Sequence, residues 1–301
     1  MTASVTQHGP FVPPVHEALP HQIVGALAQH RMATTAQLGA LLRPDASRQT
    51  VSNPLRRLHR EDLIDFVTLP GTRARAWFLT AQGVRLSRDW PHLRGRPPYP
   101  VTSKSAASMK TAHTLTAVRA HLAFLSDARR RGDEYGYLDW TPEVAHPLGD
   151  SGRVIADALM HYVLQGADGR RAKLRCLVEI DRATSSSERL ARKLIDYARL
   201  YAYTPVPGRR SLAGPVGPVW QRSYPVFPRI LFVLTGAGAV TLSNRLKDLQ
   251  AMAAEHPAVA AFARTVPLGA AVLEDMEDGG PSAAVWTRLN GRGGTCSWTE
   301  L

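Results

Sequence analysis

The chain has 301 residues and a formal net charge of +12, from 37 Lys or Arg and 25 Asp or Glu side chains. One hydrophobic core rarely grows beyond about 250 residues, so we expect two domains. The only cysteines are Cys176 and Cys296, which excludes a disulfide framework and a cysteine-rich zinc site. The first residues lack a signal-peptide pattern, and no stretch approaches the roughly 18 apolar residues of a membrane span. We therefore expect a cytoplasmic protein that does not bind membranes.

The excess positive charge is concentrated in the first third of the chain. Residues 1–110 carry 14 basic and 6 acidic side chains, whereas residues 111–301 carry 23 and 19. Such a field attracts polyanions, and nucleic acid is the polyanion that a protein without membrane segments meets most often. The distribution predicts double-stranded DNA as a partner of the N-terminal region. The alternative is a basic surface without a partner.

Residues 21–89 show the element order of a winged helix-turn-helix domain, after residues 1–20, which we expect to be flexible. Apolar residues recur at helical spacing after His21, near Thr34 and after Ser47, which predicts three helices. The two β-rich runs of LIDFVTLPGTRARAWFLT then predict a hairpin, and LTAQGVRLSRDW predicts a closing helix. The alternative for this segment is a small helical domain used for dimerisation.

The third predicted helix has an apolar stripe on one side and basic or amide side chains on the other. This pattern is typical of a helix that enters the major groove, and a basic hairpin beside it suits a wing on the phosphate backbone. Pro54 lies inside the helix, where it should kink the helix or delay its start. We expect phosphate contacts from Arg48, Arg56, Arg57, Arg73 and Arg75, and base contacts from Gln49 and Asn53.

Residues 90–110 are rich in Pro, Gly and Ser and predict a basic linker to a second domain, residues 111–301. TAHTLTAVRAHLAFLSDARRRG predicts a helix, and EYGYLDW, RVIADALMHYVL and KLRCLVEID predict three strands. Ser185 followed by Glu188 predicts a capping box that opens the next helix. The apolar run RILFVLTG predicts a central buried strand. We therefore expect a mixed-sheet α/β second domain and, for the whole chain, an α+β or α/β class.

Two of the predicted strands carry acidic side chains that interrupt otherwise apolar runs. Glu179 and Asp181 share one face of a strand because side chains alternate, and Asp157 lies on the preceding strand. Carboxylates that converge repel one another and are costly to desolvate, so a positive group should lie among them. The candidates are a metal ion, Lys193 and Arg182. The alternative is a structural cluster paired with arginines.

The order helix, three strands, helix and strand resembles the core of the PD-(D/E)xK nuclease-like, or restriction-endonuclease-like, fold. The resemblance implies that Asp157 and Glu179 hold Mg²⁺ or Mn²⁺ for phosphodiester cleavage, with Asp181 as a third ligand. Ala156 stands where the motif has Pro, and Asp181 stands where it has Lys. Lys193 on the following helix resembles a replacement for that lysine, so the implied catalytic residues are Asp157, Glu179, Asp181 and Lys193.

The segments HTLTAVRAHL and EIDRATSS, the strand with Asp157 and the helix with Lys193 and Tyr197 resemble the replication-relaxation family of bacterial, largely actinobacterial, proteins. The resemblance covers about residues 21–205 and implies a DNA-binding protein of plasmid or mobile-element replication or relaxation. It does not imply a defined enzymatic activity, so metal-dependent nicking remains a hypothesis. A homodimer and plasmid replication or transfer proteins are candidate partners.

A second function class stays open on the sequence alone. The chain could be a non-catalytic winged-helix transcriptional regulator or a replication accessory protein, whose second domain mediates dimerisation or binds a partner. No His-x-His pair occurs among the 11 histidines, which excludes a close match to strand-cleaving proteins built on a His-hydrophobe-His metal site. Any cleavage would therefore have to use the carboxylates.

Overall fold

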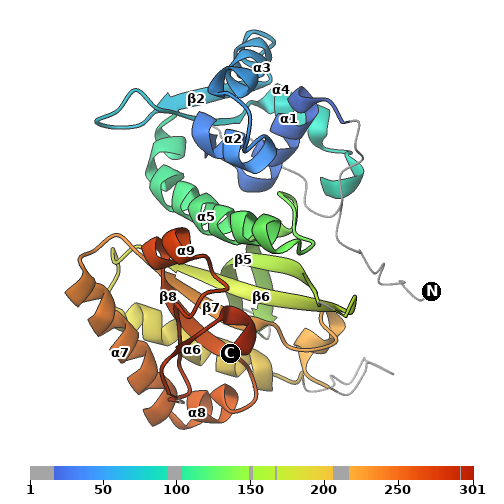
Figure 1. The fold of residues 1–301 in the computed structure, drawn as a ribbon. Coiled ribbons are helices and arrows are strands. Elements are labelled where there is room, and N and C mark those ends of the chain that lie inside the picture. Colours follow the sequence, from blue (N-terminus) through green and yellow to red (C-terminus); the bar gives the residue numbers. More distant parts are fainter. Residues whose placement is uncertain (1–16, 94–103, 149–151, 167, 206–216, 292) are drawn as a thin grey trace. The chain divides into compact units, whose positions relative to one another are not determined.

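The computed structural model describes residues 17–93, 104–148, 152–166, 168–205, 217–291 and 293–301 (Figure 1). They form two compact units. The first unit comprises the residues up to Thr141 together with His161–Lys173, and the second comprises Pro142–Met160 and Leu174–Leu301. Most of the predicted flexible segment, residues 1–16, and most of the predicted linker, residues 94–103, lie outside the described residues. The last part of that linker begins the helix α5 (Lys104–Arg131).

The first unit begins with the helices and the hairpin that the sequence predicted. In chain order it contains α1 (Leu19–His30), β1 (Ala33–Thr34), α2 (Thr35–Leu42), α3 (Arg48–Arg60), β2 (Ile64–Thr68), β3 (Arg75–Leu79), α4 (Ala81–Ser87), η1 (Pro91–Leu93) and α5. The strands form an antiparallel sheet in the order β1-β3-β2, and β2 and β3 pair from Ile64 with Leu79 to Thr68 with Arg75. Pro70 and Gly71 form the hairpin turn, where Gly71 has a φ of +70°. This is the Pro-Gly pattern of a type II turn, which requires a positive φ at its third residue.

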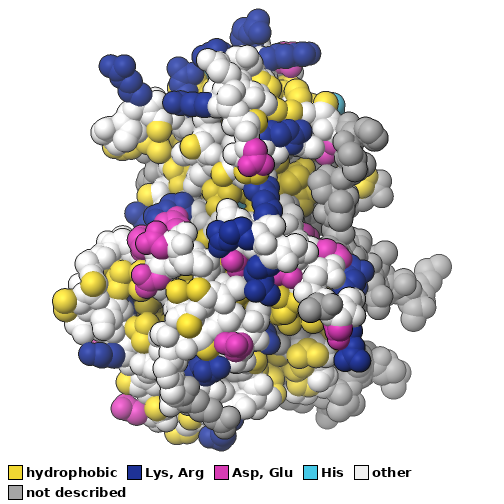
Figure 2. Space-filling model, viewed as in Figure 1, with side chains coloured by type: hydrophobic (Ala, Val, Ile, Leu, Met, Phe, Trp, Pro, Cys, Tyr) yellow, Lys and Arg dark blue, Asp and Glu magenta, His cyan; other side chains and the backbone are white. Residues whose placement is uncertain are grey.

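Helix α3 is amphipathic, and its polar side faces solvent. Val51, Leu55 and Leu58 are buried on one side, and dark blue Lys and Arg side chains gather over the region of α3 and the hairpin in Figure 2. Pro54 lies within the helix, but α3 begins at Arg48 directly after its N-cap residue, so the helix does not start late. Pro54 has no amide hydrogen, so the carbonyl of Thr50 lacks its usual helical hydrogen bond. Thr50 is exposed to solvent.

The segment after α5 is not the strand that EYGYLDW predicted. Glu134 forms an isolated bridge to Val163, and the regular strand β4 (Trp140–Leu148) begins at the last residue of the predicted run. The residues between them form a turn, because the amide of Asp139 donates to the carbonyl of Gly136 and the Asp139 carboxylate accepts from the amide of Gly136. A local carboxylate-to-backbone bond therefore competes successfully with strand pairing here.

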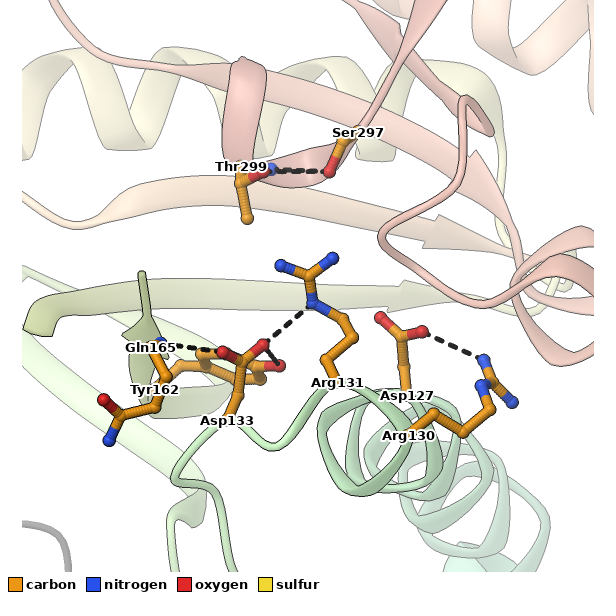
Figure 3. Close-up of polar contacts among 8 residues, drawn as sticks. All are labelled: Asp127, Arg130, Arg131, Asp133, Tyr162, Gln165, Ser297 and Thr299. Carbon is orange, nitrogen blue, oxygen red and sulfur yellow. Dashed lines mark hydrogen bonds and ion pairs between the residues drawn. The ribbon is translucent and has the colours of Figure 1, made fainter. Parts of the chain in front are cut away.

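Asp133 links the end of α5 to the strand β5 (Gly152–Gln165) within the first unit (Figure 3). Its carboxylate accepts hydrogen bonds from the hydroxyl of Tyr162 at 2.8 Å, the amide of Gln165 at 2.8 Å and Nε of Arg131 at 2.9 Å. Burial opposes ionisation, but these donors outweigh it and lower the pKa of Asp133. The carboxylate is 1% exposed and fully provided with partners.

The second unit is built on a mixed sheet of seven strands in the order β10-β9-β8-β7-β6-β5-β4. The strands are β4 (Trp140–Leu148), β5 (Gly152–Gln165), β6 (Arg171–Asp181), β7 (Arg229–Leu234), β8 (Leu268–Val272), β9 (Trp286–Arg288) and β10 (Thr295–Cys296). β6, β7 and β8 are parallel, whereas β9 is antiparallel to β8 and to β10. The described helices of this unit are α6 (Ser187–Ala202), η2 (Val219–Arg222), α7 (Ala239–Glu255), α8 (Pro257–Ala263), α9 (Leu273–Gly279) and η3 (Trp298–Glu300). A mixed α+β class is therefore confirmed.

One apolar core joins the sheet to α6, α7 and α8. Leu177 of β6 and Phe232 of β7 pack in the same cluster as Tyr197 of α6, Leu249 of α7 and Phe262 of α8. The side chains of a strand alternate between faces, so Glu179 and Asp181 lie on the same face of β6 as Leu177. Both carboxylates are therefore directed into the layer of helices and not toward open solvent.

Helix α6 does not begin with the predicted capping box. Its N-cap residue is Ser186, which makes no side-chain capping bond. The carbonyl of Ser185 instead accepts a hydrogen bond from the guanidinium of Arg245. A tertiary contact thus replaces the local contact that the sequence favoured. No helix in the described part of the chain is long and apolar enough to cross a membrane.

Two histidines are buried together in the first unit. His30 of α1 and His121 of α5 are 2% and 0% exposed, and their ring centroids lie 4.9 Å apart. Each donates from Nε2 to a backbone carbonyl, His30 to Tyr137 at 3.1 Å and His121 to Gly136 at 3.3 Å. Burial lowers the pKa of His30 from 6.5 to about 4. Burial and then the charge of His30 lower the pKa of His121.

We expect the first unit to lose stability as the pH falls below 6.5. The pKa of His30 is lower in the folded state, so between pH 6.5 and about 4 the unfolded chain binds more protons, and protonation favours unfolding. The slope for one such histidine is about 1.4 kcal/mol per pH unit. Urea unfolding at several pH values measures it. His30→Gln should flatten the slope relative to that of the wild type; an unchanged slope would contradict this account.

Candidate functional site

Glu179 lies at the centre of a buried polar cluster in the second unit. It is 3% exposed. Its Oε1 accepts hydrogen bonds from the hydroxyl of Tyr197 at 2.5 Å and from Nζ of Lys193 at 3.0 Å, and the same ammonium lies 3.0 Å from Oε2. Lys193 and Tyr197 are four residues apart on α6, so both project from the same side of that helix toward β6.

The backbones of β5 and β6 complete this cluster. Nζ of Lys193 donates to the carbonyl of Ile155 at 2.8 Å, and Oδ2 of Asp157 accepts from the amide of Ile180 at 2.8 Å. Both strands are neighbours in the sheet. The predicted residues Asp157, Glu179 and Lys193 are therefore brought together, by two strands and the helix that follows them.

The cluster perturbs the protonation of Glu179. Burial, followed by the charge of Asp157, raises the pKa of Glu179 to about 7, although Lys193 and Tyr197 oppose the rise. A carboxyl with a pKa near 7 is present in both protonation states at neutral pH. Such a group can accept or donate a proton near neutrality, and carboxyls of this kind are concentrated at functional sites.

Asp181 lies in a separate ion pair. Its Oδ2 is 2.7 Å from a guanidinium nitrogen of Arg245, which comes from α7, and its Oδ1 accepts from the amide of Ala183 at 3.1 Å. The side chains of Arg245 and Asp181 are only 9% and 5% exposed. The sequence reasoning did not identify Arg245. The sequence feature that points to Arg245 is its position in the apolar stripe of a helix, between Leu242 and Leu249, where an unpaired charge is disfavoured.

The predicted metal site fits these residues only in part. Among the described residues, no group of three or more His, Cys, Asp or Glu side chains could hold a metal ion. Asp181 forms an ion pair with Arg245. Asp157 and Glu179 are close enough for the charge of Asp157 to raise the pKa of Glu179. Two carboxylates suffice for Mg²⁺, which keeps several of its waters. The role of these residues as metal ligands stays a prediction.

The residues predicted to contact DNA lie on α3 and the β2–β3 hairpin of the first unit. All are exposed: Arg48, Gln49, Asn53, Arg56, Arg57, Arg73 and Arg75. Arg57 forms an ion pair with Glu61 at 2.8 Å, and the guanidinium of Arg75 lies 4.1 Å from the centre of the Phe66 ring. Arg60, the last residue of α3, adds a further exposed cation to this surface.

Together these features define an α+β protein with a basic helix-and-hairpin surface in one unit and a buried carboxylate–lysine cluster in the other. A family model described as replication-relaxation matches residues 24–211, which is more than half of the chain. The chain belongs to the replication-relaxation family. No curated protein and no solved structure matches it.

Asp181→Asn should destabilise the second unit by about 3–5 kcal/mol, because it leaves the guanidinium of Arg245 buried without its counter-charge. Replacing both partners, with Asp181→Leu and Arg245→Met, should be less damaging than the single change. Urea unfolding monitored by circular dichroism measures both. Asp168→Asn removes an exposed pair with Arg170 and should change stability by less than about 1 kcal/mol; a loss as large as that of Asp181→Asn would contradict the assignment.

Proposed function

We propose that the protein binds double-stranded DNA through α3 and the β2–β3 hairpin, and that it does so in the replication or relaxation of a plasmid or other mobile element. The element order α1-β1-α2-α3-β2-β3, with β1 and β2 on either side of β3, supports a winged helix-turn-helix arrangement. Family membership supports the biological context. The observation that supports DNA binding most directly is the exposed row of Arg, Gln and Asn residues on α3, opposite its buried stripe.

The periodicity of α3 separates base contacts from phosphate contacts. At about 100° per residue, Gln49, Asn53 and Arg60 project opposite the stripe of Val51, Leu55 and Leu58. These side chains would point toward the floor of the major groove, where amides pair with adenine and guanidinium groups with guanine. Arg48 and Arg57 project more to the sides, where the phosphate strands run.

The hairpin would contact the phosphate backbone beside the groove. Arg73 is exposed next to the turn, with no neighbouring acid among residues 69–75. Arg75 stacks on Phe66, which limits the conformations of its guanidinium. A cation held in this way loses less conformational entropy when it binds a phosphate than a free surface arginine would lose.

Strand cleavage at the Glu179 cluster is a second candidate function. The observation that favours it is a carboxyl with a raised pKa, held between Asp157 and Lys193 on the element sequence α5-β4-β5-β6-α6-β7. Asp157 and Glu179 would hold Mg²⁺ or Mn²⁺, which would polarise a phosphoryl oxygen of the DNA. Without cleavage, the protein would act as a regulator or replication accessory whose second unit dimerises or binds another protein.

We expect the wild-type protein to bind duplex DNA with an affinity that falls steeply with salt, since each phosphate contact releases counterions. Arg56→Gln should weaken binding and make the negative slope of log K against log [salt] less steep by about 0.9. Fluorescence anisotropy with a labelled duplex between 50 and 200 mM salt, a range of about fourfold, measures both. Arg170→Gln, which removes an exposed arginine of the β5–β6 hairpin, is the matched control. An affinity that does not depend on salt, or equal effects of the two variants, would reject the proposed surface.

If the Glu179 cluster cleaves DNA, supercoiled plasmid should become nicked in the presence of Mg²⁺ or Mn²⁺. Glu179→Gln and Asp157→Asn should each reduce the rate about 100-fold or more, in the range of lost general acid–base catalysis. Gel electrophoresis of the plasmid measures the rate, and Asp168→Asn, at an exposed carboxylate, is the control. Nicking that survives Glu179→Gln would assign the activity elsewhere or to a contaminant.

A further inference from the structure

We infer that Arg129 of α5 is a positioning residue for α3, because its guanidinium closes the C-terminal end of α2 and so fixes the turn from which α3 starts. The inference rests on the proposed DNA-binding function of α3. All three helices belong to the first unit. Arg129 lies 69 residues beyond the end of α3 in the chain and outside the basic surface defined above.

The last four carbonyls of a helix have no partner within it, and α2 shows a partner for each of them. The guanidinium of the C-cap residue Arg43 donates to the carbonyl of Leu42 at 2.5 Å, and the carbonyl of Arg43 accepts from the amide of Ala46 at 3.2 Å. The other two carbonyls, of Ala40 and Leu41, accept from the two terminal nitrogens of Arg129 at 2.6 and 2.5 Å. Arg129 of α5 therefore supplies the partners of two of the four end carbonyls of α2.

The chemistry of this contact requires an arginine. A guanidinium presents two parallel N–H groups at a fixed spacing, which suits two successive carbonyls, whereas a lysine ammonium is a point charge. Its positive charge also complements the negative end of the helix dipole of α2. Asp45, in the turn that follows α2, attracts the same guanidinium electrostatically. Arg129 thus acts on both the helix end and the turn.

The start of α3 has few restraints of its own. The turn residues 44–47 are exposed, and the N-cap residue Ser47 makes no side-chain capping bond. The first buried residue of α3 is Val51, one turn into the helix. The direction of the first turn, which carries Arg48 and Gln49, therefore depends on where α2 ends.

Helix α5 also holds the other end of α2. Nε2 of Gln37 donates to the carbonyl of Leu115 at 2.9 Å, while Oε1 of the same side chain accepts from the amide of Thr34 in the capping box. Contacts at both ends restrict sliding and tilting of α2 against α5. Since α2 leads directly into α3, α5 serves as the support against which the DNA-contacting helix is oriented.

Arg129→Met tests this role, because it keeps the apolar stem and removes the donors. Arg130→Met is the matched control, since Arg130 pairs with Asp127 on α5 itself and its side chain is 56% exposed. Arg129→Lys should restore binding in part. Anisotropy with the labelled duplex is measured at a temperature where circular dichroism shows each variant folded, and amide hydrogen exchange is measured without DNA.

We expect Arg129→Met to bind DNA about tenfold more weakly with an unchanged salt slope, because no phosphate contact is lost. Exchange at the amides of Ala46 and Thr50 should rise, while the β2–β3 amides stay protected. A folded Arg129→Met variant with wild-type affinity and exchange would overturn the inference. So would a salt slope reduced as in Arg56→Gln, which would make Arg129 a phosphate contact. If the wild type does not bind DNA, the proposed function fails, and the exchange measurement still decides whether Arg129 positions the turn.

Discussion

A carboxylate that is buried away from water is stable only beside a positive charge and hydrogen-bond donors, and β6 carries two such carboxylates. The cations and donors that pair with these two carboxylates determine how the helices of the second unit attach to the sheet. Helix α6 supplies Lys193 and Tyr197 to Glu179, and α7 supplies Arg245 to Asp181. Each helix is thus fixed in register by one polar contact inside an otherwise apolar layer, where side-chain packing alone would tolerate small shifts.

The two carboxylates lie in different chemical environments because they pair with different cations. The guanidinium of Arg245 also bonds the carbonyl of Ser185, so Asp181 is part of a contact that joins α7 to the chain before α6. The ammonium of Lys193 is shared between Glu179 and the carbonyl of Ile155, and its side chain is 32% exposed. The cluster around Glu179 therefore includes a partly exposed cation, whereas both members of the Asp181–Arg245 pair are buried.

Local patterns in the sequence were enough for most of the fold. The helices after His21 and Ser47, the Pro-Gly hairpin and the strand with Glu179 follow from apolar periodicity and turn chemistry, which act within a few residues. The failures have two causes. The turn before Trp140 is held by a local bond between the Asp139 carboxylate and the amide of Gly136, which competes with strand pairing. At Ser185, where the sequence predicted a capping box, the carbonyl is bound by Arg245, 60 residues away. For the site, the sequence placed Asp157, Glu179 and Lys193 together, but it could not show that Arg245, 64 residues away, would claim Asp181.

The course of the chain between the two units has a consequence for where the chain can be divided. The chain leaves the first unit after Thr141, returns for His161–Lys173 and leaves again. A fragment that ends at Thr141 would lack Tyr162 and Gln165, and the Asp133 carboxylate would lose two of its three donors. A break after Thr141 therefore does not release the first unit as an intact piece. The shortest continuous segment that contains the whole first unit ends at Lys173, so it carries Asp157 with it and divides β6 before Glu179.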